Sequence, residues 1–152
     1  MNLEVGTLLR WNHFPWPRYG TEIKPRWFIY LGDNGPFAQI AFVYLATTTT
    51  QIEHFKSGGA RNGHNHFKFE TRQFASFDND CIIDYDDPPY AIKKQYLLNH
   101  QADLEVKGKL NEQTLRMIYN NLLKSDACSK MVLLDLHSSF NNAGITSLKK
   151  PK

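Results

Sequence analysis

Cysteine and long apolar runs are both scarce in this sequence. The two cysteines, Cys81 and Cys128, lie far apart, which argues against a disulfide framework and makes a reducing cytoplasm the expected compartment. The longest apolar runs are far too short to span a bilayer. The N-terminus also lacks the charged start, apolar stretch and small-residue cleavage site of a secretory signal. We therefore expect a cytoplasmic protein without a membrane partner.

The composition is that of a folded protein rich in strand-forming residues. Hydrophobic residues make up 41% of the 152 positions and aromatic residues 13%, which excludes a disordered chain. This length suits one compact domain, which we place at residues 1–140. Residues 141–152 end in Lys149-Lys150-Pro151-Lys152 and are expected to form a disordered basic tail.

The net charge of +3 is unevenly distributed. The segment from Arg10 to Arg26 contains four cationic residues and a single acidic residue, Glu22. Five aspartates fall within residues 78–87 without a cation among them. A polyanion would be drawn to the first segment and repelled by the second, although two solvated loops would explain the pattern equally well.

The pattern of apolar residues predicts a sheet followed by helices. Strands are expected at residues 6–11, 26–31, 37–45, 66–70 and 81–83, with a hairpin turn at 32–36 and irregular segments at 12–25 and 51–65. Asn111 is a good N-cap for a helix that carries Leu115, Ile118 and Leu122 on one face. Residues 130–140 fit either a second helix or a buried strand.

Two short segments of the predicted hairpin carry the most concentrated chemistry. Arg26 opens one strand, and Thr47-Thr48-Thr49-Thr50 closes the next. At one edge of the sheet, a guanidinium and a hydroxyl would suit a phosphodiester, because the planar arginine fork can place two hydrogen bonds on phosphate oxygens. The alternatives are a surface arginine paired with an aspartate and an ordinary β-branched strand end.

The order and spacing of these segments resemble the MazF/PemK family of toxins. The resemblance covers about residues 6–125, and no single motif within it is specific. The residues that carry it are Gly6, the proline- and glycine-containing first loop, Lys24-x-Arg26, the threonine with Gln51, Asp80-Cys81-Ile82-Ile83, and Lys107-Gly108-Lys109-Leu110-Asn111 with the helix that follows. The chain departs from the family at Trp27, where proline is usual, and in the length of segment 51–65.

This resemblance implies a mostly β fold with α, namely an SH3-like β-barrel with one or more C-terminal helices. It also implies a homodimer that cleaves single-stranded RNA without a metal or other cofactor, and that a cognate antitoxin neutralises. Arg26 would take the role of the catalytic arginine. Thr49 would be the catalytic threonine because it forms a Thr-x-Gln pattern with Gln51, with Thr47 and Thr48 as close rivals.

Proton transfer in this reaction needs a titratable group, and imidazole suits the task. His13, His64 and His66 fall near the proposed site, and strand alternation favours His66 as the third catalytic residue. The His64-x-His66 spacing lacks a third ligand, so no metal site is expected. Asp86 or Asp87 matches an acidic residue that functions in some family members, or is simply an aspartate in a turn before proline.

The first loop is the expected RNA-binding element. Aromatic residues alternate there with cations, and aromatic faces can stack on unpaired bases while cations follow the phosphates. The RNA-binding candidates are Arg10, Trp16, Arg18, Lys24 and Gln51. A small hydrophobic core around Trp16 explains the aromatic residues equally well. The sequence thus predicts an endoribonuclease toxin, with a non-catalytic SH3-like module that binds nucleic acid or protein as the alternative.

Overall fold

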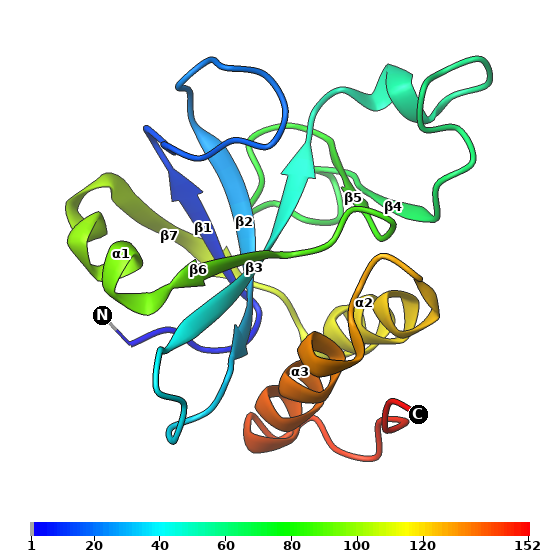
Figure 1. Cartoon of the computed structure of the whole chain (residues 1–152). Coiled ribbons are helices and arrows are strands. Elements are labelled where there is room, and N and C mark those ends of the chain that lie inside the picture. The colour runs from blue at the N-terminus through cyan, green and yellow to red at the C-terminus, as the bar shows by residue number, and fades with distance from the viewer. Residues whose placement is uncertain (1) are drawn as a thin grey trace.

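A bent antiparallel sheet, with the two longest helices on one side, forms the centre of the protein (Figure 1). The computed structural model describes residues 2–152. The strands are β1 (Thr7–Trp11), β2 (Arg26–Asp33), β3 (Phe42–Thr49), β4 (His66–Phe69), β5 (Cys81–Asp84), β6 (Tyr90–Lys93) and β7 (Leu104–Lys109). The α-helices are α1 (Lys94–Asn99), α2 (Glu112–Lys124) and α3 (Lys130–Asn142), and short 3-10 helices span Ile52–Phe55 and Gln101–Asp103. The expected mostly β fold with α is confirmed.

Strand β3 belongs to two groups of strands. The strand order is β4-β5-β3-β2-β1-β7, and β6 also pairs with β3. The pairing of β3 with β2 ends at Phe28 and Thr47, whereas the last residues of β3 pair with β5 and the first residues of β2 pair with β1. The start of β2 and the tip of β3 therefore diverge (Figure 1). Among residues 2–152, β4 and β7 remain the terminal strands of this order.

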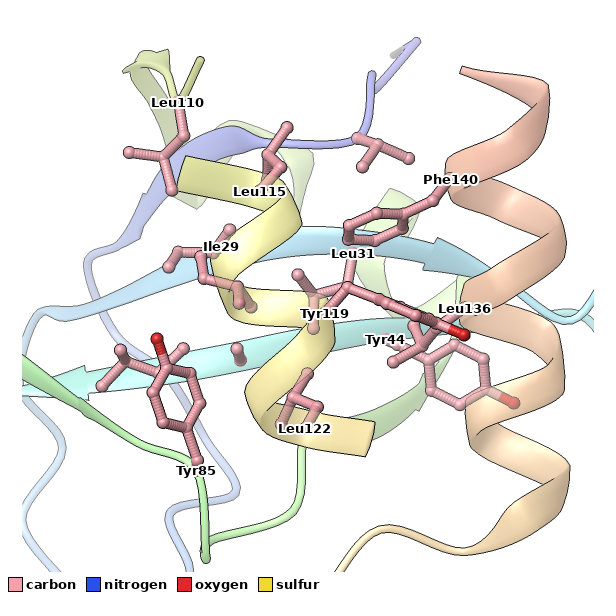
Figure 2. Close-up of a cluster of buried hydrophobic side chains, with 14 of the residues drawn as sticks. Ile29, Leu31, Tyr44, Tyr85, Leu110, Leu115, Tyr119, Leu122, Leu136 and Phe140 are labelled. Atoms are coloured by element: carbon pink, nitrogen blue, oxygen red, sulfur yellow. The ribbon is translucent and has the colours of Figure 1, made fainter. Parts of the chain in front are cut away.

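Both faces of the sheet are buried, in two separate clusters. Along β2, Ile29 and Leu31 belong to a helix-side cluster, which α2 and α3 cover, whereas Phe28 and Tyr30 belong to a loop-side cluster. This alternation follows from the two-residue period of a strand. Figure 2 shows the helix-side cluster, in which Ile29 and Leu31 meet side chains from both helices. The loop-side cluster is closed by side chains of the first loop, β6 and α1.

The two long helices follow from their caps and apolar faces. The Asn111 side chain accepts a hydrogen bond from the Thr114 N–H, which confirms the predicted start of α2. Ser129 caps α3 by accepting from the Val132 N–H, so the undecided segment 130–140 is a helix.

Within residues 2–152, no helix combines the length and the apolar character needed to cross a membrane.

Several element boundaries differ from the sequence-based prediction. The third strand was expected at 37–45, but residues 37–41 lie in a loop, and Phe37 is 98% exposed. The Asn34 side chain closes this loop by donating to the Ile40 carbonyl and accepting from the Phe42 N–H. The strand consequently starts later and includes Thr47, Thr48 and Thr49. Strands β6 and β7 and helix α1 were not predicted.

The C-terminal segment packs against the helices, which differs from the expected disordered tail. Ile145 and Pro151 are buried. The Tyr119 hydroxyl of α2 donates to the Lys149 carbonyl at 2.6 Å, and Arg116 donates to the Thr146 carbonyl at 2.7 Å. These helix donors and the buried apolar side chains fix a segment whose sequence is otherwise polar and basic.

Removing residues 145–152 is expected to destabilise the protein by at least about 2 kcal/mol. The truncation exposes the surface that Ile145 covers and leaves the Tyr119 hydroxyl without its acceptor. Urea unfolding followed by circular dichroism measures the effect. As a control, replacing the exposed Lys150 by glutamine should leave the midpoint unchanged, and an unchanged midpoint for the truncated chain would contradict the prediction.

Candidate functional site

A cavity of about 370 Å³ lies where β2 and β3 diverge. Its walls come from the first loop (residues 12–25), the start of β2, the end of β3, β5, and the segments before and after β5. The predicted site residues that line it are Lys24, Arg26, Thr47, Thr48, Thr49, Thr50, Gln51 and Asp87. The structure thus brings the arginine and the threonines of the two strand ends to one hollow.

Strand alternation places Arg26 and Thr49 on the same face of the sheet. Arg26 lies two residues before Phe28, which points into the loop-side cluster. Thr49 lies four residues after Leu45, which points into the same cluster. Because side chains alternate along a strand, Arg26 and Thr49 continue the loop-side face.

Arg26 has no carboxylate partner. The other five arginines each have a carboxylate oxygen within 4.0 Å, and Arg26 is the exception among residues 2–152. Its Nη2 donates to the carbonyls of Tyr19 at 3.5 Å and Glu22 at 3.3 Å, and its buried Nε has no partner. The interpretation of Arg26 as a surface arginine paired with an aspartate is therefore wrong. The loop carbonyls hold a guanidinium whose charge is not neutralised by direct pairing.

The hydrogen bonds of the threonines distinguish Thr49 from its neighbours. The Thr47 hydroxyl donates to the Thr48 carbonyl at 3.4 Å. The Thr49 oxygen instead accepts from the Gln51 N–H at 3.1 Å. Its proton thus remains free to be donated to a ligand in the cavity.

Arg61 is a cavity residue that the sequence reasoning missed. Its guanidinium lies 4.5 Å from the centroid of the Tyr19 ring and 3.4 Å from the Asp84 carboxylate. The His64 Nδ1 lies 2.8 Å from the same carboxylate. Arg61 therefore ties segment 51–65 both to the first loop and to β5. The signal in the sequence was Asp84 in an apolar strand, because a buried carboxylate requires a cationic or hydrogen-bonding partner.

The aspartates of residues 78–87 are not all solvated, contrary to one interpretation of the sequence. Asp84 is buried against Arg61, and Asp87 lies 3.2 Å from the Arg18 guanidinium. Burial raises the pKa of Asp87 above its ordinary value, although Arg18 acts in the opposite direction. Asp87 lines the cavity, so a carboxyl group with a raised affinity for protons is present there.

Several other predicted residues lie outside this cavity. Arg10 precedes Trp11 of the loop-side cluster by one residue and pairs with Glu105, so it belongs to the opposite face. His66 stacks on Phe55 with ring centroids 4.9 Å apart. Arg18 donates to the carbonyls of Pro88 and Pro89, and this contact fixes the first loop instead of leaving the arginine free for RNA.

Trp16, also outside the cavity, contributes to an aromatic core. Its ring centroid lies 5.9 Å from that of Trp11, 5.6 Å from that of Tyr96 and 5.4 Å from that of His100. The contacts with Trp11 and His100 are edge-on, a geometry that stabilises a fold, whereas the Tyr96 ring is tilted by 33°. These contacts support a packing role for Trp16, which remains 41% exposed.

Replacing Trp16 by alanine is expected to lower the free energy of unfolding by about 1–2 kcal/mol, because the half-buried indole loses apolar contacts. RNA affinity should stay unchanged. Urea unfolding and filter binding of a single-stranded RNA measure the two quantities. Weaker RNA binding at unchanged stability would restore the role of Trp16 in base stacking.

A second group of polar side chains, which shares Asp84 with the cavity, has the composition of a metal site. Ligand atoms of His64, Asp84 and Asp86 all lie within 4.8 Å of one another. However, the Asp84 carboxylate already accepts from Arg61, and Asp86 accepts from the Ser125 hydroxyl. Protein donors therefore occupy these carboxylates, and the charge of Arg61 opposes a cation. The group is therefore better suited to hydrogen bonding between loops than to binding a metal.

Cys81 lines the cavity but is not suited to nucleophilic chemistry. Burial raises the pKa of its thiol to about 12, so the thiolate is absent at neutral pH. Cys81 is therefore not a candidate nucleophile in this cavity.

Comparisons of this chain with family models, with curated proteins and with solved structures give no match. The family resemblance rests on the residues of this chain alone.

Proposed function

We propose that this protein is the toxin of a type II toxin–antitoxin pair and cleaves single-stranded RNA without a metal. In this proposal, the bent sheet is an SH3-like barrel of the MazF/PemK type. The protein acts in the cytoplasm as a homodimer, and a cognate antitoxin holds it inactive. The observation that carries the proposal is Arg26, a guanidinium without a carboxylate partner in a cavity that Thr49 also lines.

Arg26 and Thr49 would both act on the phosphate. In this reaction the 2′-oxygen of the RNA bonds to phosphorus and the bond to the 5′-oxygen breaks, which leaves a cyclic phosphate and a free 5′-hydroxyl. Negative charge grows on the non-bridging oxygens as the pentavalent state forms. Arg26 would stabilise that charge through its free N–H donors, and Thr49 would donate its free proton to the same phosphate.

Asp87 is better placed than His66 for proton transfer. It lines the cavity, and burial raises its pKa towards the range in which a carboxyl group exchanges protons with substrate. In the proposed mechanism, Asp87 accepts the proton of the 2′-hydroxyl. The protonated Asp87 then gives that proton to the departing 5′-oxygen, directly or relayed by one water molecule, and returns to its ionised state.

The proposal is tested with a short RNA that spans one cleavage position, and with the same RNA carrying a single 2′-deoxy nucleotide there. Both are incubated with the protein in EDTA. We expect the all-ribose strand to be cut to a cyclic phosphate and a 5′-hydroxyl, and the substituted strand to remain intact. Cleavage of both strands, or of neither, would overturn the proposed chemistry.

Replacing Thr49 by valine is expected to slow cleavage by about 10²-fold, because one donor to the developing charge is lost. The matched control is Thr50→Val. Thr50 also lines the cavity, but its hydroxyl does not accept a hydrogen bond like the one that the Gln51 N–H donates to the Thr49 oxygen. Single-turnover rates on one RNA compare the two variants. Equal rates would remove Thr49 from the mechanism.

The alternative function, a module that binds nucleic acid or protein without turnover, draws support from the acidic residues of the cavity. Glu22, Asp78, Asp84 and Asp87 line it together with the cations. Carboxylates weaken the attraction of an RNA backbone, so within this alternative they favour a protein ligand over a nucleic acid. Binding of RNA without products in the cleavage assay, or no binding of RNA at all, would favour a module without turnover over the nuclease.

A further inference from the structure

A second hollow, of about 400 Å³, lies beside α2, α3 and the C-terminal segment. It is lined by Lys130, Lys149, Lys150 and Lys152, with Asp126 as the one acidic residue around it. Four cationic side chains and one acidic side chain therefore surround this hollow. None of these residues lines the cavity of Arg26.

The lysines of this hollow are not neutralised by ion pairs. Among residues 2–152, the lysines with a carboxylate oxygen within 4.0 Å are Lys56 and Lys109. Lys149, Lys150 and Lys152 are exposed. Clustered cations without counterions repel one another, and an anionic ligand would relieve that repulsion.

The backbone that carries these lysines is fixed. The Lys149 carbonyl accepts from the Tyr119 hydroxyl, and the Leu148 carbonyl lies 3.3 Å from the His137 Nε2. Pro151 is buried between the exposed Lys150 and Lys152. The C-terminal cations are thus anchored beside Lys130 of α3, whereas a frayed tail would disperse them.

We infer that this lysine hollow binds the phosphate backbone of a nucleic acid, at a place separate from the cavity of Arg26. Lysine ammonium groups around an open hollow suit successive phosphates, which they contact as point charges. The hollow would hold a second stretch of a long single-stranded RNA. This inference concerns binding alone and does not depend on the proposed cleavage.

Binding is tested with a single-stranded RNA of about 20 nucleotides, in an Arg26→Ala background that keeps the RNA intact. The test variant carries Lys149→Gln, Lys150→Gln and Lys152→Gln. The matched control carries Lys56→Gln, Lys68→Gln and Lys94→Gln, which removes the same charge from exposed positions outside both hollows. Circular dichroism verifies that both variants fold.

We expect the test variant to bind RNA about tenfold more weakly than the control at ~0.1 M salt. The decrease of log affinity with log salt should become less steep by up to about 2, since each lost phosphate contact reduces the steepness by about 0.7. Equal affinities and slopes for the two variants would overturn the inference. So would a test variant that loses binding to polyglutamate but keeps its affinity for RNA, because the hollow would then serve an acidic protein.

A dinucleotide substrate separates this inference from the proposed cleavage. It is too short to reach both hollows, so the three lysine substitutions should leave its cleavage rate unchanged when Arg26 is intact. If no substrate is cleaved, the proposed function fails while the binding result still stands. A slower dinucleotide reaction would show that the lysines act through the catalytic cavity, which contradicts a separate site.

Discussion

Replacing Arg26 by lysine is expected to lower the rate of RNA cleavage by about 10²–10³-fold, although the charge is kept. A guanidinium offers several N–H donors in a fixed plane, whereas an ammonium acts as a point charge. Lysine also cannot hold the Tyr19 and Glu22 carbonyls and a phosphate with the same geometry. Single-turnover cleavage of one RNA by the two proteins measures the loss.

The control for this substitution is Arg72→Lys. The Arg72 side chain is 75% exposed and pairs with Glu70, so its conservative replacement should leave the rate unchanged. If Arg26→Lys cleaves as fast as the unaltered protein, the planar fork of the arginine is not needed and the mechanism is wrong.

Replacing Phe14 by alanine is expected to lower the free energy of unfolding by about 3–5 kcal/mol. Phe14 is fully buried, and its ring centroid lies 5.0 Å from that of Trp11 and 4.8 Å from that of Phe28. The resulting void cannot be refilled by the rigid rings around it. Urea unfolding followed by tryptophan fluorescence and circular dichroism measures the change.

A residue at the opposite extreme of burial provides the comparison for Phe14. Phe37 is 98% exposed, so Phe37→Ala should change stability by less than about 0.5 kcal/mol. A small effect of Phe14→Ala would mean that the first loop is not part of the core. The carbonyls that hold Arg26 would then lack a rigid support.

Helix α2 and strand β5 could be predicted from the sequence, because the signals for both lie within a few neighbouring residues. Helix α2 follows from its Asn111 cap and the apolar spacing after it, and β5 from its short apolar run. The start of β3 was misplaced because Phe37 and Ile40 look like strand residues. In the structure, the Asn34 side chain closes a loop there by hydrogen bonds to the backbone of Ile40 and Phe42. The periodicity of apolar residues does not reveal such bonds.

The candidate site was predictable where it depends on neighbouring strands. A hairpin necessarily brings the start of β2 near the end of β3, so Arg26 and Thr49 could be paired from the sequence. Arg10 was misassigned, although its position one residue before the buried Trp11 already places it on the other face. Asp84 in its apolar strand indicated that a cationic or hydrogen-bonding partner was needed, but not that Arg61 would be that partner, because Arg61 lies far from Asp84 and Tyr19 in the sequence.

The place of His66 also depends on long-range packing. Alternation in β4 was correctly expected, but it does not tell which face borders a cavity. Phe55, from the 3-10 helix of the second loop, covers the His66 ring. Such a contact arises from the folding of a glycine-containing loop, whose path the sequence does not specify.

The proposed cleavage of RNA depends on Arg26 in its cavity. To test this, the purified protein, Arg26→Ala and Arg72→Ala are each incubated with one long single-stranded RNA in EDTA, and the products are followed on a denaturing gel. We expect cleavage by the unaltered protein and by Arg72→Ala, and none by Arg26→Ala. Intact RNA with all three proteins, or equal cleavage by Arg26→Ala, would contradict it.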